Sequence, residues 1–114
     1  VHRYVAVWNE TDPVARRKAI SQLWAPEGVH YVRSLEARGY AALEERVVGA
    51  YEKNVRDGGY RFRAMKDVQA LQNVVTFHWE MVPAGGDTIA AVGLEFLILD
   101  EHERILSDFQ FIVG

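Results

Sequence analysis

The first quarter of the chain has the spacing of two amphipathic helices. Four large apolar residues recur at i, i+3, i+4 and i+7 and predict one face of a first helix: Val1, Tyr4, Val5 and Trp8. A second helix is expected to begin at Pro13, because the first helical position needs no N–H, with Thr11 or Asp12 as its N-cap. The segment 25–28, which contains a proline and a glycine, is expected to end this helix.

A third and longer helix follows a short extended piece. Residues 29–32 read as extended, and a polar loop leads from them to Gly39. Apolar residues then recur every three or four positions over residues 40–55, which predicts a helix. The turn Asp57-Gly58-Gly59 is a strong stop signal and ends it.

After residue 59, apolar side chains no longer recur with the spacing of a helix but at every second position. Alternating side chains predict strands over four segments: 60–65, 74–82, 89–99 and 105–113. Turn-forming residues connect these strands at 72–73, 83–87 and 100–103. Three helices followed by an antiparallel meander predict an α+β fold in a single domain over residues 1–114.

Composition limits the classes of partner. The 114 residues are the length of one domain. Thirteen Lys and Arg against sixteen Asp and Glu give a net charge of −3, which argues against a nucleic-acid partner. No apolar run approaches the roughly 20 residues that a membrane helix needs. We therefore expect a cytoplasmic protein with neither a nucleic-acid nor a membrane partner.

The absence of cysteine and the placement of charges narrow the chemistry. With no cysteine, the chain has no disulfide, no thiolate nucleophile and no Cys-based zinc site. Its histidine and carboxylates are of the right type for a metal, but no local spacing such as His-x-x-x-His occurs, so we expect neither a metal nor another cofactor. The charged residues at 16–18 and 44–46 are typical of solvated helix faces.

Four segments, in this order, resemble one known superfamily: Arg3-Tyr4-Val5-Ala6-Val7-Trp8-Asn9, Leu23-Trp24-Ala25-Pro26-Glu27-Gly28-Val29, Arg38-Gly39-Tyr40-Ala41-Ala42-Leu43 and Gly93-Leu94-Glu95-Phe96. Together they resemble the nuclear transport factor 2-like superfamily, which includes ketosteroid isomerases and SnoaL-like polyketide cyclases. The resemblance implies a curved sheet packed around three N-terminal helices, a cone-shaped, cystatin-like roll with a pocket at its open end. It also implies a homodimer formed through the outer face of the sheet.

Polar residues on alternate strand positions are the main candidates for a site. With the inward parity that the resemblance implies, five polar side chains point into the cone: His78, Glu80, Glu95, Asp108 and Gln110. Four aromatic residues then lie on the outer face and form the expected dimer interface: Phe77, Trp79, Phe109 and Phe111. The alternative is an antiparallel sheet that keeps its polar face in water.

Carboxyl groups that share a half-closed site favour acid–base chemistry. Mutual repulsion and an apolar environment keep at least one of them protonated, next to one that is ionised. We expect Asp108, Glu95 and His78 as catalytic residues. Asp108 ranks first, because a carboxylate in an otherwise apolar strand costs stability unless it is hydrogen-bonded or used. The structural alternatives are an Asp108 that only accepts a bond from His78 or Tyr4, and a His78 that is only hydrogen-bonded within the fold.

Only some of the residue roles of the ketosteroid isomerases can be assigned to positions of this chain. By resemblance, Tyr4 matches the tyrosine that donates a hydrogen bond to the developing oxyanion, and Glu95 matches the protonated acid that assists it. The position of the general base falls on Val32, and a hydrocarbon cannot abstract a proton. Steroid-isomerase chemistry is therefore not expected, unless His30 or Asp108 supplies the base.

Two classes of function remain open. The first is an enzyme that uses acid–base chemistry on a small lipophilic substrate, as an isomerase, cyclase or dehydratase. The second is a non-catalytic ligand-binding or dimerisation domain. In either case we expect five residues to bind the small molecule: Tyr4, Trp24, His30, Glu80 and Gln110.

Overall fold

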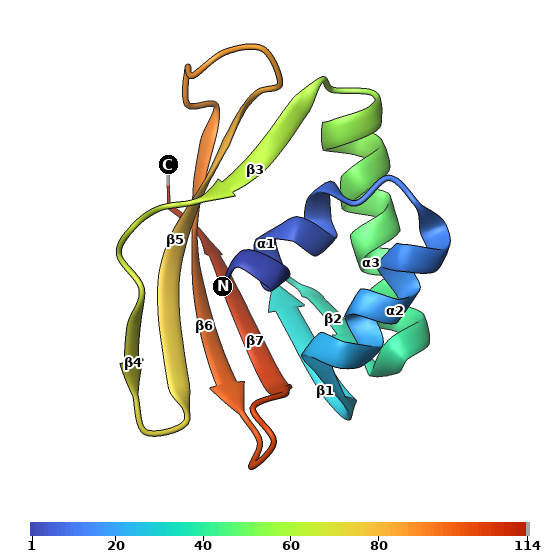
Figure 1. Cartoon of the computed structure of the whole chain (residues 1–114), viewed down its shortest axis with the longest axis vertical. Coiled ribbons are helices and arrows are strands. Elements are labelled where there is room, and N and C mark those ends of the chain that lie inside the picture. Colours follow the sequence, from blue (N-terminus) through green and yellow to red (C-terminus); the bar gives the residue numbers. More distant parts are fainter. Residues whose placement is uncertain (114) are drawn as a thin grey trace.

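Three α-helices lie on one side of a curved seven-stranded sheet in the computed structural model, which describes residues 1–113 (Figure 1). The helices are α1 (His2–Asn9), α2 (Pro13–Leu23) and α3 (Gly39–Ala50), and α3 continues into the π-helical turn η1 (Tyr51–Arg56). The strands are β1 (Trp24–Val32), β2 (Leu35–Arg38), β3 (Tyr60–Ala64), β4 (Gln69–Leu71), β5 (Val74–Pro83), β6 (Ala91–Leu99) and β7 (Ile105–Ile112). The expected α+β fold is confirmed.

The helix signals in the sequence act as expected at α2. The Asp12 carboxylate accepts hydrogen bonds from the N–H groups of Val14 and Ala15, at 3.4 and 3.3 Å, so it is the N-cap in front of Pro13. None of the helices described is long and apolar enough to cross a membrane.

Strand β1 begins earlier than the sequence predicts. α2 ends at Leu23 and the chain is already extended at Trp24, so residues 25–28 belong to β1 and form a bulge against β7. Gly28 is required in this bulge, because a Cβ there would lie 2.7 Å from the carbonyl oxygen of Ile105. The bulge brings the second half of β1 into register with β7.

Two strands were not predicted from the sequence, and the helix expected over 40–55 is present with a change of geometry. The polar loop after residue 32 contains β2, which pairs with β1 after a turn at Arg33, where φ is 51°. The short strand β4 adds a further pairing to β5. The helix expected over 40–55 changes to π-helical geometry at Tyr51. Each difference depends on tertiary pairing or on a local change of helical geometry that the apolar period does not reveal.

The sheet is mixed rather than a purely antiparallel meander. Its order is β2-β1-β7-β6-β5-β3, and β1 runs parallel to β7 while the other pairings are antiparallel. The parallel pair places His30 directly beside Asp108, although they are 78 positions apart in the sequence. Figure 1 shows β1 and β2 turned toward α2 and α3, so that the sheet curves around the helices.

The register determines which strand faces share the interior. Phe77 pairs with Glu95, and Glu95 pairs with Gln110, so these three side chains lie on the same face. Phe77 and Trp79 are therefore inside, where they are 1% and 8% exposed. The prediction that Phe77 and Trp79 form an outer aromatic face is wrong, because the apolar side of β5 packs on the core.

The core lies between this inner face and the helices. Its largest fully buried apolar side chains come from α2, β1, α3 and β5: Ile20, Trp24, Leu43 and Phe77. Each such side chain stabilises the fold by about 1.5–3 kcal/mol relative to leaving it exposed. α1 lies against β3, and the Asn9 side chain exchanges two hydrogen bonds with the Phe62 backbone, at 2.7 and 2.8 Å. This attachment holds Tyr4 over the centre of the sheet.

Candidate active site

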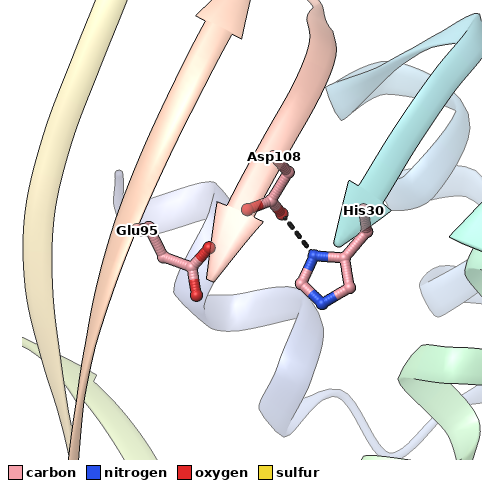
Figure 2. A group of neighbouring side chains, drawn as sticks. All are labelled: His30, Glu95 and Asp108. Carbon is pink, nitrogen blue, oxygen red and sulfur yellow. Dashed lines mark hydrogen bonds and ion pairs between the residues drawn. The ribbon is translucent and has the colours of Figure 1, made fainter. Parts of the chain in front are cut away.

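Two carboxyl groups and an imidazole meet on the inner face of the sheet. Glu95 comes from β6, Asp108 from β7 and His30 from β1, and all three are 0% exposed. Side-chain oxygen or nitrogen atoms of the three residues lie within 4.8 Å of one another. Figure 2 shows Asp108 between the other two, with its carboxylate toward the imidazole of His30.

Asp108 is the residue of this group that forms the most hydrogen bonds. Its Oδ2 atom accepts a hydrogen bond of 2.6 Å from the Tyr4 hydroxyl and lies 2.8 Å from His30 Nδ1. Burial alone raises the pKa of Asp108, but its interactions with His30, Glu95 and Tyr4 outweigh burial and hold that pKa below the usual 3.8. Asp108 is therefore ionised at neutral pH, and because a carboxylate only accepts, the hydrogen of this bond sits on His30 Nδ1.

Glu95 has the opposite protonation state. Burial, followed by the negative charge of Asp108, raises the pKa of Glu95 from 4.5 to about 11. The Trp79 indole N–H donates to Glu95 Oε1 over 2.9 Å and fixes the carboxyl group in place. At neutral pH the two carboxyl groups therefore carry one proton and one negative charge between them, with the proton on Glu95.

Three polar atoms of this group form no hydrogen bond with a nitrogen, hydroxyl or backbone group within the part of the chain that the structure describes. They are Glu95 Oε2, Asp108 Oδ1 and His30 Nε2, and all are buried. The proton on Glu95 gives its side chain a hydrogen bond to Asp108, and the His30 Nε2 atom stays without a partner in the described residues, at a cost of about 1–3 kcal/mol. The arrangement is typical of a site that binds another molecule.

A cavity of about 210 Å³ lies next to Glu95, between α1, the end of α3 and the sheet. Aromatic and aliphatic side chains form much of its wall, among them Trp8, Phe62, Trp79, Met81 and Ile112. Its polar lining includes Tyr4, Glu95 and Gln110. Neither Asp108 nor His30 lines the cavity, so within the described residues Glu95 is the carboxyl group that reaches it.

The structure brings together some of the residues predicted from sequence. Tyr4, His30, Glu95 and Asp108 form one contiguous group, and Gln110 lines the adjoining cavity. Trp24 is fully buried in the core, with its ring 5.6 Å from that of Tyr4, and does not line the cavity. The expectation that Trp24 contacts a ligand is therefore wrong for this cavity.

His78 and Glu80 lie on the other face of the sheet. The backbone N–H of His78 donates to Asp67 over 3.0 Å, and the imidazole pairs with the same carboxylate. Glu80 lies 3.4 Å from Arg63. The expectation that His78 and Glu80 point into the cone is wrong, because the residues of β5 that face inward are the apolar ones.

Three basic residues of the cavity were not predicted from the sequence: Arg33, Arg46 and Lys53. Arg46 was expected on a solvated face, but its guanidinium lies 5.3 Å from the centroid of the Trp8 ring. The spacing carried a signal, because Arg46 follows the buried Leu43 by three positions and therefore borders the apolar stripe of α3.

The buried trio also contains the donor types of a metal site. His30, Glu95 and Asp108 offer one nitrogen and two carboxyl groups within reach of a common ion. In this arrangement, however, His30 Nδ1 already bonds Asp108, and Glu95 holds a proton that an ion would have to displace. The donor set therefore fits proton chemistry better than metal binding.

Comparison with known proteins agrees with this architecture. A crystal structure of a candidate isomerase of the SnoaL-like family from Agrobacterium tumefaciens matches with a TM-score of 0.89 and 26% identity, over 99% of this chain and 93% of that one. A candidate polyketide cyclase from Sinorhizobium meliloti matches with a TM-score of 0.73 and 12% identity, over 96% and 90%.

A nuclear transport factor 2-like protein with a cystatin-like fold from Novosphingobium aromaticivorans matches with a TM-score of 0.68 and 16% identity, over 99% of this chain and 77% of that one. At such low identities, this match and that of the Sinorhizobium protein show the shared fold alone. A search of curated proteins gave no match. The sequence model of the SnoaL-like domain matches residues 1–107, which is nearly the whole chain. The chain therefore belongs to the family of SnoaL-like domains.

Proposed function

We propose that this protein is an acid–base enzyme that binds a small substrate through a carbonyl or hydroxyl oxygen at Glu95. The reaction class is an isomerisation, cyclisation or dehydration. One observation carries the proposal: a protonated, buried Glu95 lines the cavity. A carboxylic acid held neutral in this way can donate a hydrogen bond or a proton to a substrate oxygen.

The charge distribution supports this role for Glu95. When negative charge develops on a substrate oxygen, a fixed donor in a water-poor site stabilises it more strongly than water does. The Trp79 indole donates to Oε1, so the proton of Glu95 is carried by Oε2, the atom that donates to a substrate oxygen in this proposal. Asp108 does not line the cavity and is a positioning residue, because its negative charge keeps the proton on Glu95.

Tyr4 and His30 support Asp108 rather than the substrate. Burial, followed by the charges of Asp108 and Glu95, raises the pKa of Tyr4 well above 10, so its hydroxyl stays protonated and donates a hydrogen bond to Asp108. With His30 bonded to the same oxygen, Asp108 remains ionised in an apolar environment. This assigns Tyr4 a different partner from the oxyanion that the resemblance implies.

The cavity has no ionised carboxylate or imidazole among the described residues that line it. Val32, where the resembling isomerases place their general base, is buried and 5% exposed. The proton acceptor must then be water or a group of the substrate itself. This favours reactions in which a hydrogen bond from Glu95 stabilises negative charge that develops on oxygen, such as loss of a β-hydroxyl group through an enolate or ring closure onto a carbonyl.

The same observation favours one alternative, a ligand-binding domain without chemistry. A cavity with a single neutral acid and an apolar wall is sufficient to bind and orient a molecule. The alternative predicts that a bound compound leaves the protein unchanged. It also predicts that substitution of Glu95 changes affinity only.

The two functions separate in an experiment with simple carbonyl compounds. The purified protein is incubated in D2O with a panel of small β-hydroxy ketones, enones and keto acids, and NMR follows conversion and exchange at carbon. We expect conversion of at least one compound, and a loss of about two to four powers of ten in rate for Glu95→Gln. His78→Gln, on the outer face, is the matched control and should retain the rate. Binding without conversion across the panel would favour the alternative.

A further inference from the structure

Three cations line the cavity, and each comes from a different element. Arg33 lies in the turn between β1 and β2, Arg46 on α3 and Lys53 in η1. None of the three forms an ion pair with any of residues 1–113. Five other arginines each pair with a carboxylate: Arg17, Arg38, Arg56, Arg63 and Arg104. Of the eight basic residues that form no ion pair within residues 1–113, three line this cavity.

Arg46 is the best fixed of the three. Its guanidinium lies over the Trp8 ring at 5.3 Å, and its Nε is buried without a hydrogen-bond partner in the described chain. A charged donor left unpaired at a half-buried position is costly, which indicates that the site is built for a negatively charged partner. Burial lowers the pKa of Arg46, while Tyr4 and Glu95 raise it and Arg33 lowers it, so these groups lie close enough to interact.

The charge of the cavity is opposite to that of the whole chain. The protein carries −3 overall, yet the groups lining the cavity include three cations, while Glu95 is neutral and Tyr4 keeps its proton. The negative charge of Asp108 lies outside this lining. A cluster of one sign in a partly enclosed site raises the local concentration of the opposite ion.

The volume limits the size of the occupant. A dry cavity of about 150 Å³ admits one benzene molecule. A cavity of about 210 Å³ therefore encloses about one six-membered ring with a few further atoms. Trp8, Phe62 and Met81 provide an apolar surface for the body of such a molecule.

We propose that the cavity selects small organic acids: molecules about the size of one ring whose carboxylate binds Arg46, Arg33 and Lys53. The proposal of a carboxylate-binding site depends only on the three cations. The statement that a carbonyl or hydroxyl oxygen of the same molecule lies at Glu95 rests on the proposed function. The lipophilic ligand expected from the sequence thus becomes an acid with a compact apolar body.

The test compares three probes of defined charge: benzoate, its neutral isostere benzamide, and inorganic phosphate. Binding is measured by titration calorimetry and ligand-observed NMR. We expect benzoate to bind at least about tenfold more tightly than benzamide, since a charge-assisted hydrogen bond is worth about that factor, and to weaken as salt is added. Equal binding of benzoate and benzamide would overturn the proposal. Phosphate binding as tight as that of benzoate would also overturn it, because the site would then bind anions without selecting an organic acid.

Variants of the three cations locate the site. Arg46→Gln should weaken benzoate binding about tenfold, and Arg33→Gln and Lys53→Gln each several-fold. Arg38→Gln and Lys18→Gln change the net charge equally on exposed surface away from the cavity, and should leave benzoate binding unchanged. Arg33 and Lys53 are exposed, so their variants test the site even if Arg46→Gln fails to fold. Equal effects of cavity and control variants would overturn the assignment.

This experiment is independent of turnover. Benzoate binding that depends on Arg46, together with no conversion of any carbonyl compound, would support the acid site and contradict the proposed enzyme. Conversion of neutral compounds that depends on Glu95, without benzoate binding, would support the proposed enzyme and contradict the acid site.

Discussion

Trp79 lies directly over Gly93, its pairing partner on the neighbouring strand β6. A Cβ atom on Gly93 would overlap the indole ring, so no other residue fits beneath Trp79 in this position. Because the ring lies flat against the backbone of β6, its Nε1 reaches Glu95 Oε1, two residues further along. Gly93 therefore acts on the candidate site through Trp79, without touching the cavity itself.

The first prediction concerns Gly93→Ala. The added methyl group must displace a rigid, buried ring, and overpacking of this kind costs about 1–3 kcal/mol of the free energy of unfolding. Urea denaturation measures this loss. Gly85→Ala is the control, because a Cβ there meets nothing within 4 Å and the backbone is not left-handed, so its effect should stay within about 0.5 kcal/mol. Equal stability of the two variants would contradict the packing described here.

The second prediction is a pH dependence of stability caused by Glu95. The unfolded chain loses the Glu95 proton near pH 4.5, whereas burial and the charge of Asp108 raise the pKa in the folded protein to about 11. Between these values the unfolded state binds fewer protons, so the free energy of unfolding falls as pH rises, by at most about 1.4 kcal/mol per pH unit. Asp108 adds no slope there, because its pKa is lowered and its contribution is complete above pH 3.8.

Urea denaturation of the wild type and of Glu95→Gln between pH 5.5 and about 8.5 measures how much Glu95 contributes to the pH dependence of the free energy of unfolding. The glutamine cannot ionise, so the variant should lack the part of the slope that Glu95 supplies. The difference between the two curves isolates Glu95 from the other titrating groups. Parallel curves would mean that Glu95 is ionised in the folded protein, and they would remove the protonated acid on which the proposed function depends.

The third prediction separates a positioning role of Asp108 from a purely structural one. Asp108→Asn keeps the shape and can still accept the bond from Tyr4, but it removes the negative charge. Burial remains as the larger cause, so the pKa of Glu95 should fall below about 11 yet stay above 4.5. Carbon NMR of the glutamate carboxyl groups, or the infrared band of a protonated carboxylic acid, reports this shift. Asp67→Asn removes a carboxylate on the outer face and should leave Glu95 unchanged.

The sequence is informative where a property is local. The cap at Asp12, the proline at the start of α2 and the strand alternation after residue 59 all act within a few positions, and the structure has them as expected. Resemblance of short segments predicted the fold and placed Glu95 in the interior. The hydrogen bond from Tyr4 to Asp108 was foreseen as an alternative to catalysis, and it is present.

The errors concern relations between distant strands. Alternation shows which residues of β5 share a face, but not which face meets the inward residues of β6, and a shift of one residue exchanges the two. This is why His78 was expected inside and Trp79 outside. The parallel pairing of β1 with β7 also has no local signal, although it places His30 beside Asp108. The basic lining was missed because Arg33, Arg46 and Lys53 come from three elements that only the fold brings together.

The outer face of the sheet retains part of the expected aromatic surface. Phe96 and Phe109 are cross-strand neighbours with ring centroids 6.2 Å apart, and Tyr31 stacks on Phe109 at 5.1 Å. Phe96 and Phe111 are 36% and 53% exposed. This surface replaces the set predicted from sequence, since Phe77 and Trp79 belong to the interior.

The last prediction is that this outer surface holds two copies of the chain together. An exposed patch of large aromatic side chains on a sheet is unfavourable in water, and a second copy of the same face covers it symmetrically. Phe111→Glu places a charge on that surface and should convert a dimer into a folded monomer in analytical ultracentrifugation. Val14→Glu, at a residue 68% exposed on α2, introduces the same charge on the helical side and should leave the dimer intact. A wild-type monomer at micromolar concentration would contradict the prediction, and so would a Phe111→Glu dimer.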